Sequence, residues 1–166
     1  MALSPTLQKY LADQRVAYDV IPHERTTSSL GTAEKSHIFA DSLAKGILLR
    51  DWQGYWLAVL PASRHARLSD LRADLGERVG LASEKEIAQV FRDCARGAIP
   101  PFGECYGLDM IIDSSIDEQP ELYCEGGDHA TLVHVSRAEF ARLNGKARHG
   151  SFASLNEATE PPAPRG

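Results

Sequence analysis

The sequence has no long hydrophobic run, few cysteines and no excess of basic residues. No apolar segment approaches the roughly 18–20 residues of a transmembrane helix, and no basic region followed by a long apolar one opens the chain. We therefore expect neither a membrane span nor a secretory signal. The three cysteines, Cys94, Cys105 and Cys124, have no metal-like spacing. They favour free thiols in a reducing cytoplasm over a disulfide framework.

The signatures of several enzyme classes are also missing. There is no P-loop, no G-x-G-x-x-G and no G-x-S-x-G, and no serine or cysteine has the local sequence of a nucleophile. Cys124, His129 and His134 fit no standard zinc spacing and lack an evident fourth ligand. We therefore expect no metal and no cofactor.

The charge of the chain argues against a DNA-binding protein. The net charge is −5, whereas a dedicated non-specific DNA binder is usually basic. The segment 137–149 contains one acid, Glu139, and four basic residues, Arg137, Arg142, Lys146 and Arg148. Local contact with RNA is compatible with this segment, although a solvated helix face is the commoner origin of such a pattern.

What is present suits one globular domain. The chain has 166 residues, of which 43% are apolar and 25% charged, and it has no internal repeat or linker. Its end is polar and rich in proline. We expect a domain over 1–150 and a disordered tail over 151–166.

Helix and strand signals are interspersed along the chain. Ser4 before Pro5 is typical of a helix start, as are the pairs Ser83/Glu86 and Ser136/Glu139. Helices are predicted over 4–16, 28–40, 67–76 (capped by Ser69), 83–94 and 136–145, and strands over 17–23, 43–51, 54–62, 78–82, 106–116, 121–127 and 130–135. Several strands are close enough for hairpins, which predicts a mixed α/β or α+β domain with a largely antiparallel or mixed sheet.

A single lysine lies among apolar residues in the segment SLAKGILLR, residues 42–50. In a strand, Lys45 shares one face with Leu43 and Leu49. A buried ammonium without a partner is costly. Lys45 therefore either extends to solvent from an edge strand or lines a pocket for an anionic or carbonyl-bearing ligand. Gly46 beside it lets another group approach the backbone closely.

A loop and a strand end supply further candidates. The segment GAIPPFG, residues 97–103, combines two flexible glycines with two stiff prolines. Free amides in such a loop can bind an anion or an oxyanion, although a plain structural turn is the more common role. Asp113 ends an apolar strand, where it can pair with Lys45 or cap the following turn, and capping is the commoner role.

Seven segments in order resemble one known family. They are YDVIPHERT, LAKGILLRD, WLAVLPAS, LRADLGERVGLASEKEI, GAIPPFG, LDMIIDSSI and YCEGGDHATLVHV. Over Leu7 to Leu143 the chain resembles the YbaK/ProX family of trans-editing aminoacyl-tRNA deacylases. These enzymes are relatives of the insertion editing domain of bacterial prolyl-tRNA synthetase.

The resemblance implies a curved, barrel-like mixed sheet flanked by helices. It also implies hydrolysis of a wrong small amino acid from the 3′ end of a tRNA, typically proline tRNA. Lys45 matches the near-invariant lysine of the family. His129 matches a histidine of subfamilies that edit alanyl-tRNA, whereas Gly46 stands where those subfamilies carry asparagine.

The resemblance also assigns site residues. We predict catalytic roles for Lys45, Gly97 and Asp113. Substrate contacts are predicted for Gly46, Ile99, Pro100, Gly126, Gly127 and His129. In the expected mechanism, water attacks the ester while Lys45 and backbone amides stabilise the developing charge. The expected partners are the acceptor end of an aminoacyl-tRNA and a prolyl-tRNA synthetase, with no DNA and no membrane.

Two other functions stay open on the sequence. One is a non-catalytic module of the same fold that binds a nucleotide or a tRNA end. The other is a small hydrolase of free esters or nucleotides. The amino acid removed is also open, because alanine, cysteine, serine, threonine and 2-aminobutyrate are all small enough.

Overall fold

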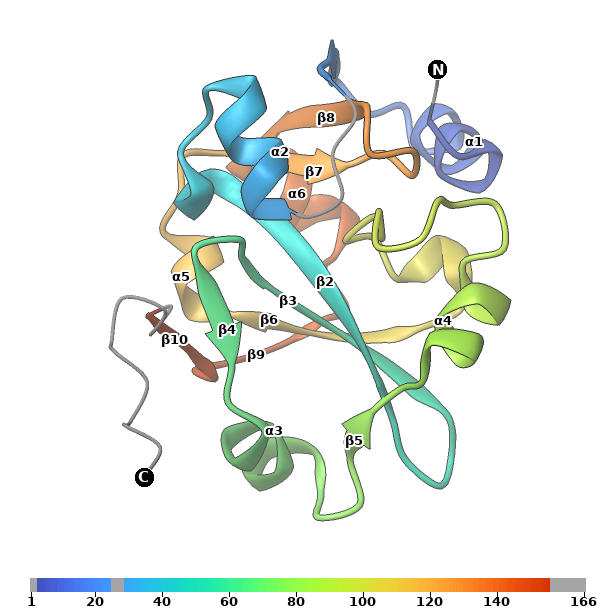
Figure 1. Ribbon diagram of the computed structural model, residues 1–166, viewed down its shortest axis with the longest axis vertical. Helices are drawn as coiled ribbons and strands as arrows, with labels where there is room; N and C mark the ends of the chain where they lie inside the picture. The colour runs from blue at the N-terminus through green and yellow to red at the C-terminus, as the bar shows by residue number, and fades with distance from the viewer. Residues whose placement is uncertain (1–2, 25–28, 156–166) are drawn as a thin grey trace, which may run out of the picture.

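The computed structural model describes residues 3–24 and 29–155, and within these ranges the chain folds around one large mixed sheet (Figure 1). This eight-stranded sheet has the order β1-β8-β7-β2-β3-β6-β9, and β5 also pairs with β2. A second, two-stranded sheet joins β4 and β10. The strands are β1 (Asp19–Pro22), β2 (Leu43–Arg50), β3 (Tyr55–Pro61), β4 (Arg64–Ala66), β5 (Gly80–Leu81), β6 (Asp109–Asp113), β7 (Glu121–Glu125), β8 (Thr131–Ser136), β9 (Arg148–Gly150) and β10 (Ala153–Leu155). The predicted mixed α/β class is confirmed.

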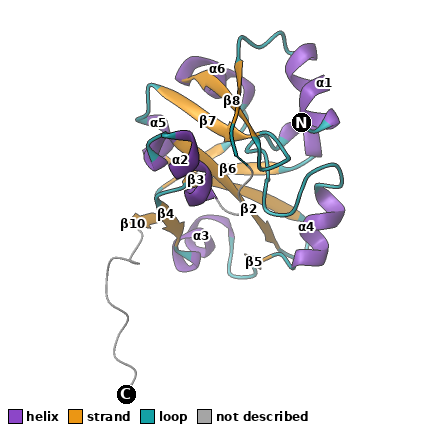
Figure 2. Cartoon of the chain, turned by 45° about the horizontal axis from the view of Figure 1, so that its top comes forward, coloured by secondary structure: helices purple, strands orange, loops and turns teal. Residues whose placement is uncertain are grey.

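Short helices are distributed around the sheet (Figure 2). They are α1 (Pro5–Asp13), α2 (Ser29–Ser36), α3 (Leu68–Leu75), α4 (Glu84–Val90), α5 (Ser114–Asp117) and α6 (Arg137–Leu143), with the 3-10 turns η1 (Ala40–Ser42) and η2 (Glu104–Tyr106). No helix in the described ranges is both long and apolar enough to cross a bilayer.

Local capping chemistry sets the starts of three helices, as predicted. Ser4 accepts a hydrogen bond from the Leu7 amide at the start of α1. Ser83 and Glu86 form both halves of a capping box on α4. Ser136 caps α6 by accepting from the Glu139 amide, but the Glu139 carboxylate accepts from the Ala17 amide, so the second half of the box is not formed. Each cap satisfies backbone amides that a helix start otherwise leaves unpaired.

The sheet is buried on both faces, because side chains of β2 alternate between two cores. Ala44 and Leu48 pack in the larger core, which also holds Phe102. Leu49 points the other way and belongs to a core with Leu71 of α3. Strand β2 therefore lies in the middle of the molecule rather than at an edge.

Two details of the predicted elements were wrong. The strand predicted over 106–116 ends at Asp113, whose side chain caps the short helix α5. Helix α3 starts after Arg67 without a side-chain cap, so Ser69 is not its cap. The amide of Arg67 instead donates to the Phe152 carbonyl at 2.7 Å, which fixes where the chain turns into the helix.

The predicted tail also starts too early. Phe152 is completely buried, and the next three residues form β10 against β4. A large apolar side chain in a core outweighs the polar composition around it. The remainder of the predicted tail, from residue 156 onward, lies outside the described residues.

Candidate functional site

Strands β2 and β7 separate after a short parallel contact, and several predicted site residues gather where they part. The contact pairs Leu43 with Tyr123 and Ala44 with Cys124. Over 45–47, the side of β2 that faces away from β3 has no strand partner in the described ranges. Crevices where neighbouring strands part are favoured ligand sites in α/β sheets. We call this place the strand split.

Lys45 is the first residue of β2 beyond the contact with β7. Its side chain is half-buried, and burial lowers the pKa of its ammonium below the ordinary lysine value. No group within 3–24 or 29–155 forms a hydrogen bond or ion pair with it. Strand β2 lies inside the sheet, but at Lys45 one of its sides is open, so the lysine lines this gap and is still partly exposed.

Residues 97–103, here called the proline loop, lie directly on β2. A Cβ on Gly46 would lie 3.1 Å from Cγ2 of Ile99 and 2.9 Å from Cδ1 of Leu57. Gly46 therefore allows a close contact between Ile99 and the strand, on the face opposite Lys45. The group that approaches the Gly46 backbone is thus a side chain of the protein itself.

Three backbone amides of the proline loop have no acceptor among the described residues. These are the N–H groups of Gly97, whose φ is +82°, of Ile99 and of the completely buried Phe102. The Ala98 amide donates to the Ala95 carbonyl at 3.0 Å. Pro100 is buried and has no N–H to offer. The free donors of this loop are therefore fewer than its length suggests.

His129 connects the proline loop to β7. Its side chain is 5% exposed, and Nε2 lies 2.6 Å from the carbonyl oxygen of Arg96. Because a carbonyl accepts but cannot donate, the proton of this contact is on Nε2. A Cβ on Gly97 would lie 3.1 Å from the same nitrogen, so the contact requires glycine there. Nδ1 points toward Glu125, at 3.8 Å from Oε2.

Glu125 is an acid that the sequence did not single out. It follows Cys124 on β7 just as Lys45 follows Ala44 on β2, so strand alternation turns both toward the same face. Its side chain is 1% exposed, and burial raises its pKa from 4.5 to about 7. Oε2 accepts a hydrogen bond from Oγ1 of Thr32 at 3.0 Å. A carboxyl group that titrates near neutrality can exchange protons at physiological pH.

The glycine turn after β7 packs against the N-terminus of the chain. The Gly126 amide donates to the Thr131 carbonyl at 3.0 Å, and the Gly126 carbonyl accepts from the Ser4 amide at 2.8 Å. A Cβ on Gly127 would lie 2.9 Å from Cβ of Ser4, and its φ is +114°. The Gly126 amide is therefore already engaged within the protein.

Asp113 has a well-defined role in the fold. Its carboxylate accepts from the Ser115 amide and hydroxyl, and from the Phe152 and Ala153 amides at 2.8 and 2.9 Å. Burial raises its pKa, but these hydrogen bonds together bring the pKa below the ordinary value. No ion pair joins Asp113 to Lys45 within the described ranges. Of the two roles open on the sequence, Asp113 therefore caps the turn.

A groove of about 430 Å³ lies between α4 and the start of the proline loop. Ile87, Phe91 and Ile99 give it an apolar wall, and Lys85, Arg92 and Arg96 line it as basic residues. Arg96 is paired with Glu84 at 3.1 Å. An apolar wall with basic groups is suited to a nucleotide, which combines a flat base with a charged phosphate.

The basic segment 137–149 does not form a free patch. Its three arginines donate to backbone carbonyls of other segments: Arg137 to Gln119, Arg142 to Gln14 and Arg148 to Asp74. These arginines stabilise contacts between distant parts of the chain. All three arginines are exposed, so they form a solvated face whose side chains also bind backbone carbonyls.

Cysteine, histidine and acidic side chains form no cluster suited to a metal ion anywhere in 3–24 or 29–155. Cys124 is buried, as expected of an unreactive thiol, and burial raises its pKa above the usual range. The strand split therefore consists of Lys45, Gly46, the loop residues Gly97 and Ile99, and the pair Glu125 and His129.

Comparison with known proteins gives a family for most of the chain. The model of a family described as an aminoacyl-tRNA editing domain matches residues 23–143. A search of curated proteins gave no match.

Solved structures share the fold. A candidate trans-editing enzyme for prolyl-tRNA synthetase is 19% identical with a TM-score of 0.78, over 92% of this chain and 99% of that one. The hypothetical protein APE2540 is 15% identical with a TM-score of 0.79, over 90% and 99% of the two chains. A protein from Marinobacter aquaeolei, described in connection with signal transduction, is 21% identical with a TM-score of 0.74. The alignment covers 92% of this chain and 31% of that larger protein.

Proposed function

Because the chain belongs to the aminoacyl-tRNA editing domain family, we propose that it is a deacylase acting in trans. It would remove a wrong small amino acid from an aminoacyl-tRNA, and proline tRNA is the substrate we favour. The similar fold of a candidate trans-editing enzyme for prolyl-tRNA synthetase supports this choice. We place the reaction in the cytoplasm, with a prolyl-tRNA synthetase as a transient partner.

The observation that carries the proposal is the half-buried, unpartnered Lys45 at the strand split. A cation without a protein partner is costly to bury, and a negatively charged ligand would offset that cost. The free amides of Gly97 and Ile99 belong to the loop packed on Gly46, on the other face of β2, so they would reach the ligand through the gap that β7 leaves beside residues 45–47. A positive charge and free N–H groups near one strand suit a carbonyl oxygen that becomes negative.

The reaction is hydrolysis of the ester between the amino acid and the terminal ribose. Water attacks the carbonyl carbon, and the bond from that carbon to the ribose oxygen breaks. One proton of the water ends on the ribose oxygen, which leaves a free amino acid and an uncharged tRNA end. Lys45 stabilises the carbonyl oxygen while it carries negative charge, together with the loop amides.

Proton transfer in this scheme is assigned to Glu125 and His129. The pKa of Glu125, raised by burial to about 7, is close to the pH at which translation takes place. His129 is fixed by the Arg96 carbonyl and faces Glu125 through Nδ1. We propose that Glu125 holds His129 in one orientation, and that the pair relays the proton lost by water.

The groove beside α4 is our candidate for the last nucleotides of the tRNA. Ile99 lines the groove and also packs on Gly46, so the two places share one loop. Lys85 and Arg92 would contact phosphates, and the partly exposed Ile87 would offer an apolar surface to a base. The net charge of −5 suits the weak, transient binding that a freestanding editing enzyme needs.

The decisive experiment measures release of alanine, cysteine, serine, threonine or 2-aminobutyrate from charged proline tRNA. Wild type is compared with Lys45→Ala and with Lys45→Met, which keeps the apolar stem. We expect wild type to release one small amino acid and both variants to be slower by about 100-fold or more. Lys9→Ala, which removes an exposed lysine of α1, serves as the control.

Three outcomes would contradict the proposal. Equal rates for wild type and both Lys45 variants would mean that the lysine has no part in the reaction. Binding of the tRNA without release would support the non-catalytic binding module instead. Equal hydrolysis of free amino acid esters would indicate a general esterase.

A further inference from the structure

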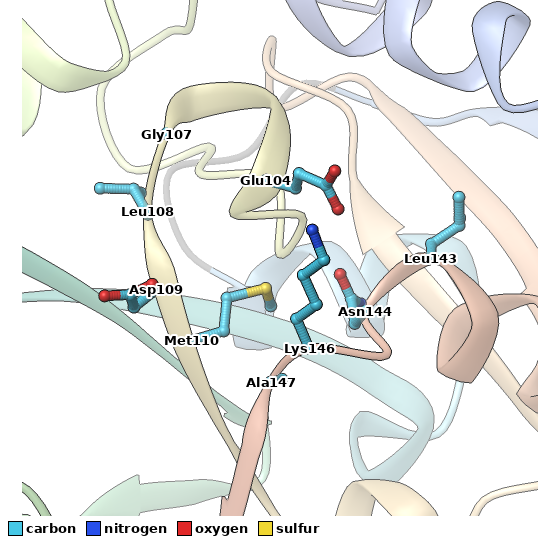
Figure 3. Close-up of a pocket in the computed structure, with 9 residues that line it drawn as sticks. All are labelled: Glu104, Gly107, Leu108, Asp109, Met110, Leu143, Asn144, Lys146 and Ala147. Carbon is cyan, nitrogen blue, oxygen red and sulfur yellow. The ribbon is translucent and has the colours of Figure 1, made fainter.

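A second cavity, of about 180 Å³, lies between η2, the start of β6 and the turn after α6 (Figure 3). Its lining shares no residue with the strand split or with the groove beside α4. Nothing in the proposed editing reaction uses it. Its chemistry is mixed, because apolar, charged and amide side chains all line one small space.

Apolar side chains form part of the lining. Leu108 comes just before β6, Met110 lies in β6, and Leu143 comes from the end of α6. Met110 and Leu143 are buried in the larger core, so this part of the lining is held by packing. Such a surface accommodates a small apolar group by excluding water from it.

Two opposite charges lie at one end of the cavity without pairing. Figure 3 shows the carboxylate of Glu104 and the ammonium of Lys146 pointing toward the same space. Both side chains are exposed, and no ion pair joins them in the described part of the chain. Asp109 lies toward the other end of the cavity in the same view.

Asn144 supplies the third observation. It follows α6 directly and is 5% exposed. Both polar atoms of its amide, Oδ1 and Nδ2, lack a hydrogen-bond partner in the described protein. A buried amide with neither a donor nor an acceptor satisfied is unfavourable, and a ligand that satisfies both would remove this cost.

We propose that this cavity binds a free α-amino acid with a small side chain. Its ammonium would donate to Glu104, and its carboxylate would accept from Lys146. Asn144, after a small shift of the turn that carries it, would hydrogen-bond the same two groups. The side chain would rest on Leu108, Met110 and Leu143.

The size of the cavity agrees with such a ligand. A volume of 180 Å³ is the share of about six water molecules in the liquid, which fits an amino acid as small as alanine or serine. An apolar molecule alone would leave the charges and the amide unused, and a large anion would meet the carboxylate of Glu104. This inference does not depend on the editing reaction, because it concerns a separate cavity.

Calorimetric titration of the full chain with L-alanine, L-serine and L-valine tests the proposal. Alanine methyl ester lacks the carboxylate and N-acetylalanine lacks the ammonium, so each removes one of the two charges. We expect the free amino acids to bind and both blocked forms to bind at least about tenfold more weakly. Lys146→Ala and Glu104→Gln should weaken binding by a similar factor, whereas Lys9→Ala and Lys45→Ala should not.

Several results would overturn the proposal. Equal binding of the free and blocked forms would show that the charges do not recognise the ligand. Binding that is lost in Lys45→Ala but kept in Lys146→Ala would place the amino acid at the strand split. A lack of heat with every amino acid at millimolar concentration would show that the cavity does not bind this class. Glu104→Gln and Lys146→Ala change exposed side chains, so their folding is checked by circular dichroism.

Discussion

At the scale of single residues, the site depends on two ionisable groups that burial shifts in opposite directions. Burial lowers the pKa of Lys45 and raises that of Glu125, because it disfavours the charged form of each group. The sequence revealed the lysine because a charge interrupts an apolar row. It did not reveal the acid, because burial in the folded protein raises the pKa of Glu125, and no local sequence pattern shows that burial.

The raised pKa of Glu125 predicts how stability depends on pH. The unfolded chain loses this proton near pH 4.5, whereas the folded chain keeps it until about pH 7. Between these values the folded state binds more protons, so the free energy of unfolding falls as the pH rises. Glu125→Gln removes this decline and should gain about 3 kcal/mol relative to wild type across the window.

Urea unfolding of both proteins below and above that window provides the measurement. The raised pKa of His134 also stabilises the fold at low pH, and this contribution is lost as the pH rises above 6.5, but it is common to both proteins and cancels in the difference. A difference between the two proteins that does not change with pH would show that Glu125 is already ionised in the fold.

At the scale of elements, the proline loop packs closely on β2 because Gly46 has no side chain. Both the glycine and the loop are visible in the sequence, but their contact is not, because Gly46 and Ile99 lie far apart in the chain. Short-range signals such as the Ser83 and Glu86 cap were predicted correctly for the opposite reason. The four-residue helix α5 was missed because it is too short to show a helical period.

Gly46→Ala should disturb the packing of the proline loop on β2. The new Cβ would lie 3.1 Å from Ile99 and 2.9 Å from Leu57, so both side chains must move. We expect a loss of about 1–3 kcal/mol in the free energy of unfolding and a slower editing reaction. In the double variant with Ile99→Ala, the loss should be smaller than the sum of the two single losses. If the two losses in the free energy of unfolding were strictly additive, Gly46 and Ile99 would not be in steric contact.

Asp113 connects β6 to the end of the described chain, and its replacement tests that connection. Asp113→Asn should lower stability by on the order of 2 kcal/mol or more, because four donors then share a weaker acceptor. Hydrogen bonds keep its pKa below 3.8, so this stabilisation is present above that pH and is lost as the pH falls through the lowered value.

Thermal unfolding near neutral pH and in acid measures the effect of Asp113→Asn. Asp117→Asn is a matched control, since Asp117 is exposed on the same short helix and contacts His149. If the two variants were equally stable, the connection through Asp113 would contribute nothing.

At the scale of the whole molecule, an acidic protein is proposed to bind an acidic RNA. The basic groups available for this are few, because the arginines of 137–149 are engaged with backbone carbonyls. Composition alone could not show this, because it counts charges without their partners. The net charge of −5 and the small number of free cations together predict weak binding.

Salt dependence of tRNA binding checks which cations take part. Lys85→Ala and Arg92→Ala should each weaken binding and reduce the slope of log affinity against log salt by about one, the value of one phosphate contact. Lys9→Ala should leave the slope unchanged, since Lys9 is paired with Asp13 away from the groove. Unchanged slopes in all three variants would place the RNA on another surface.

The hydrogen bonds from Phe152 and Ala153 to Asp113 also bear on how the protein is made. A ribosome completes β6 about forty residues before it adds those two donors. Until these residues emerge from the exit tunnel, the Asp113 carboxylate lacks two of its hydrogen-bond donors. The core that Phe152 fills is then exposed to water. Nascent chains that stop short of this segment should therefore be readily cut by protease. The domain closes only when its last described strand has been synthesised.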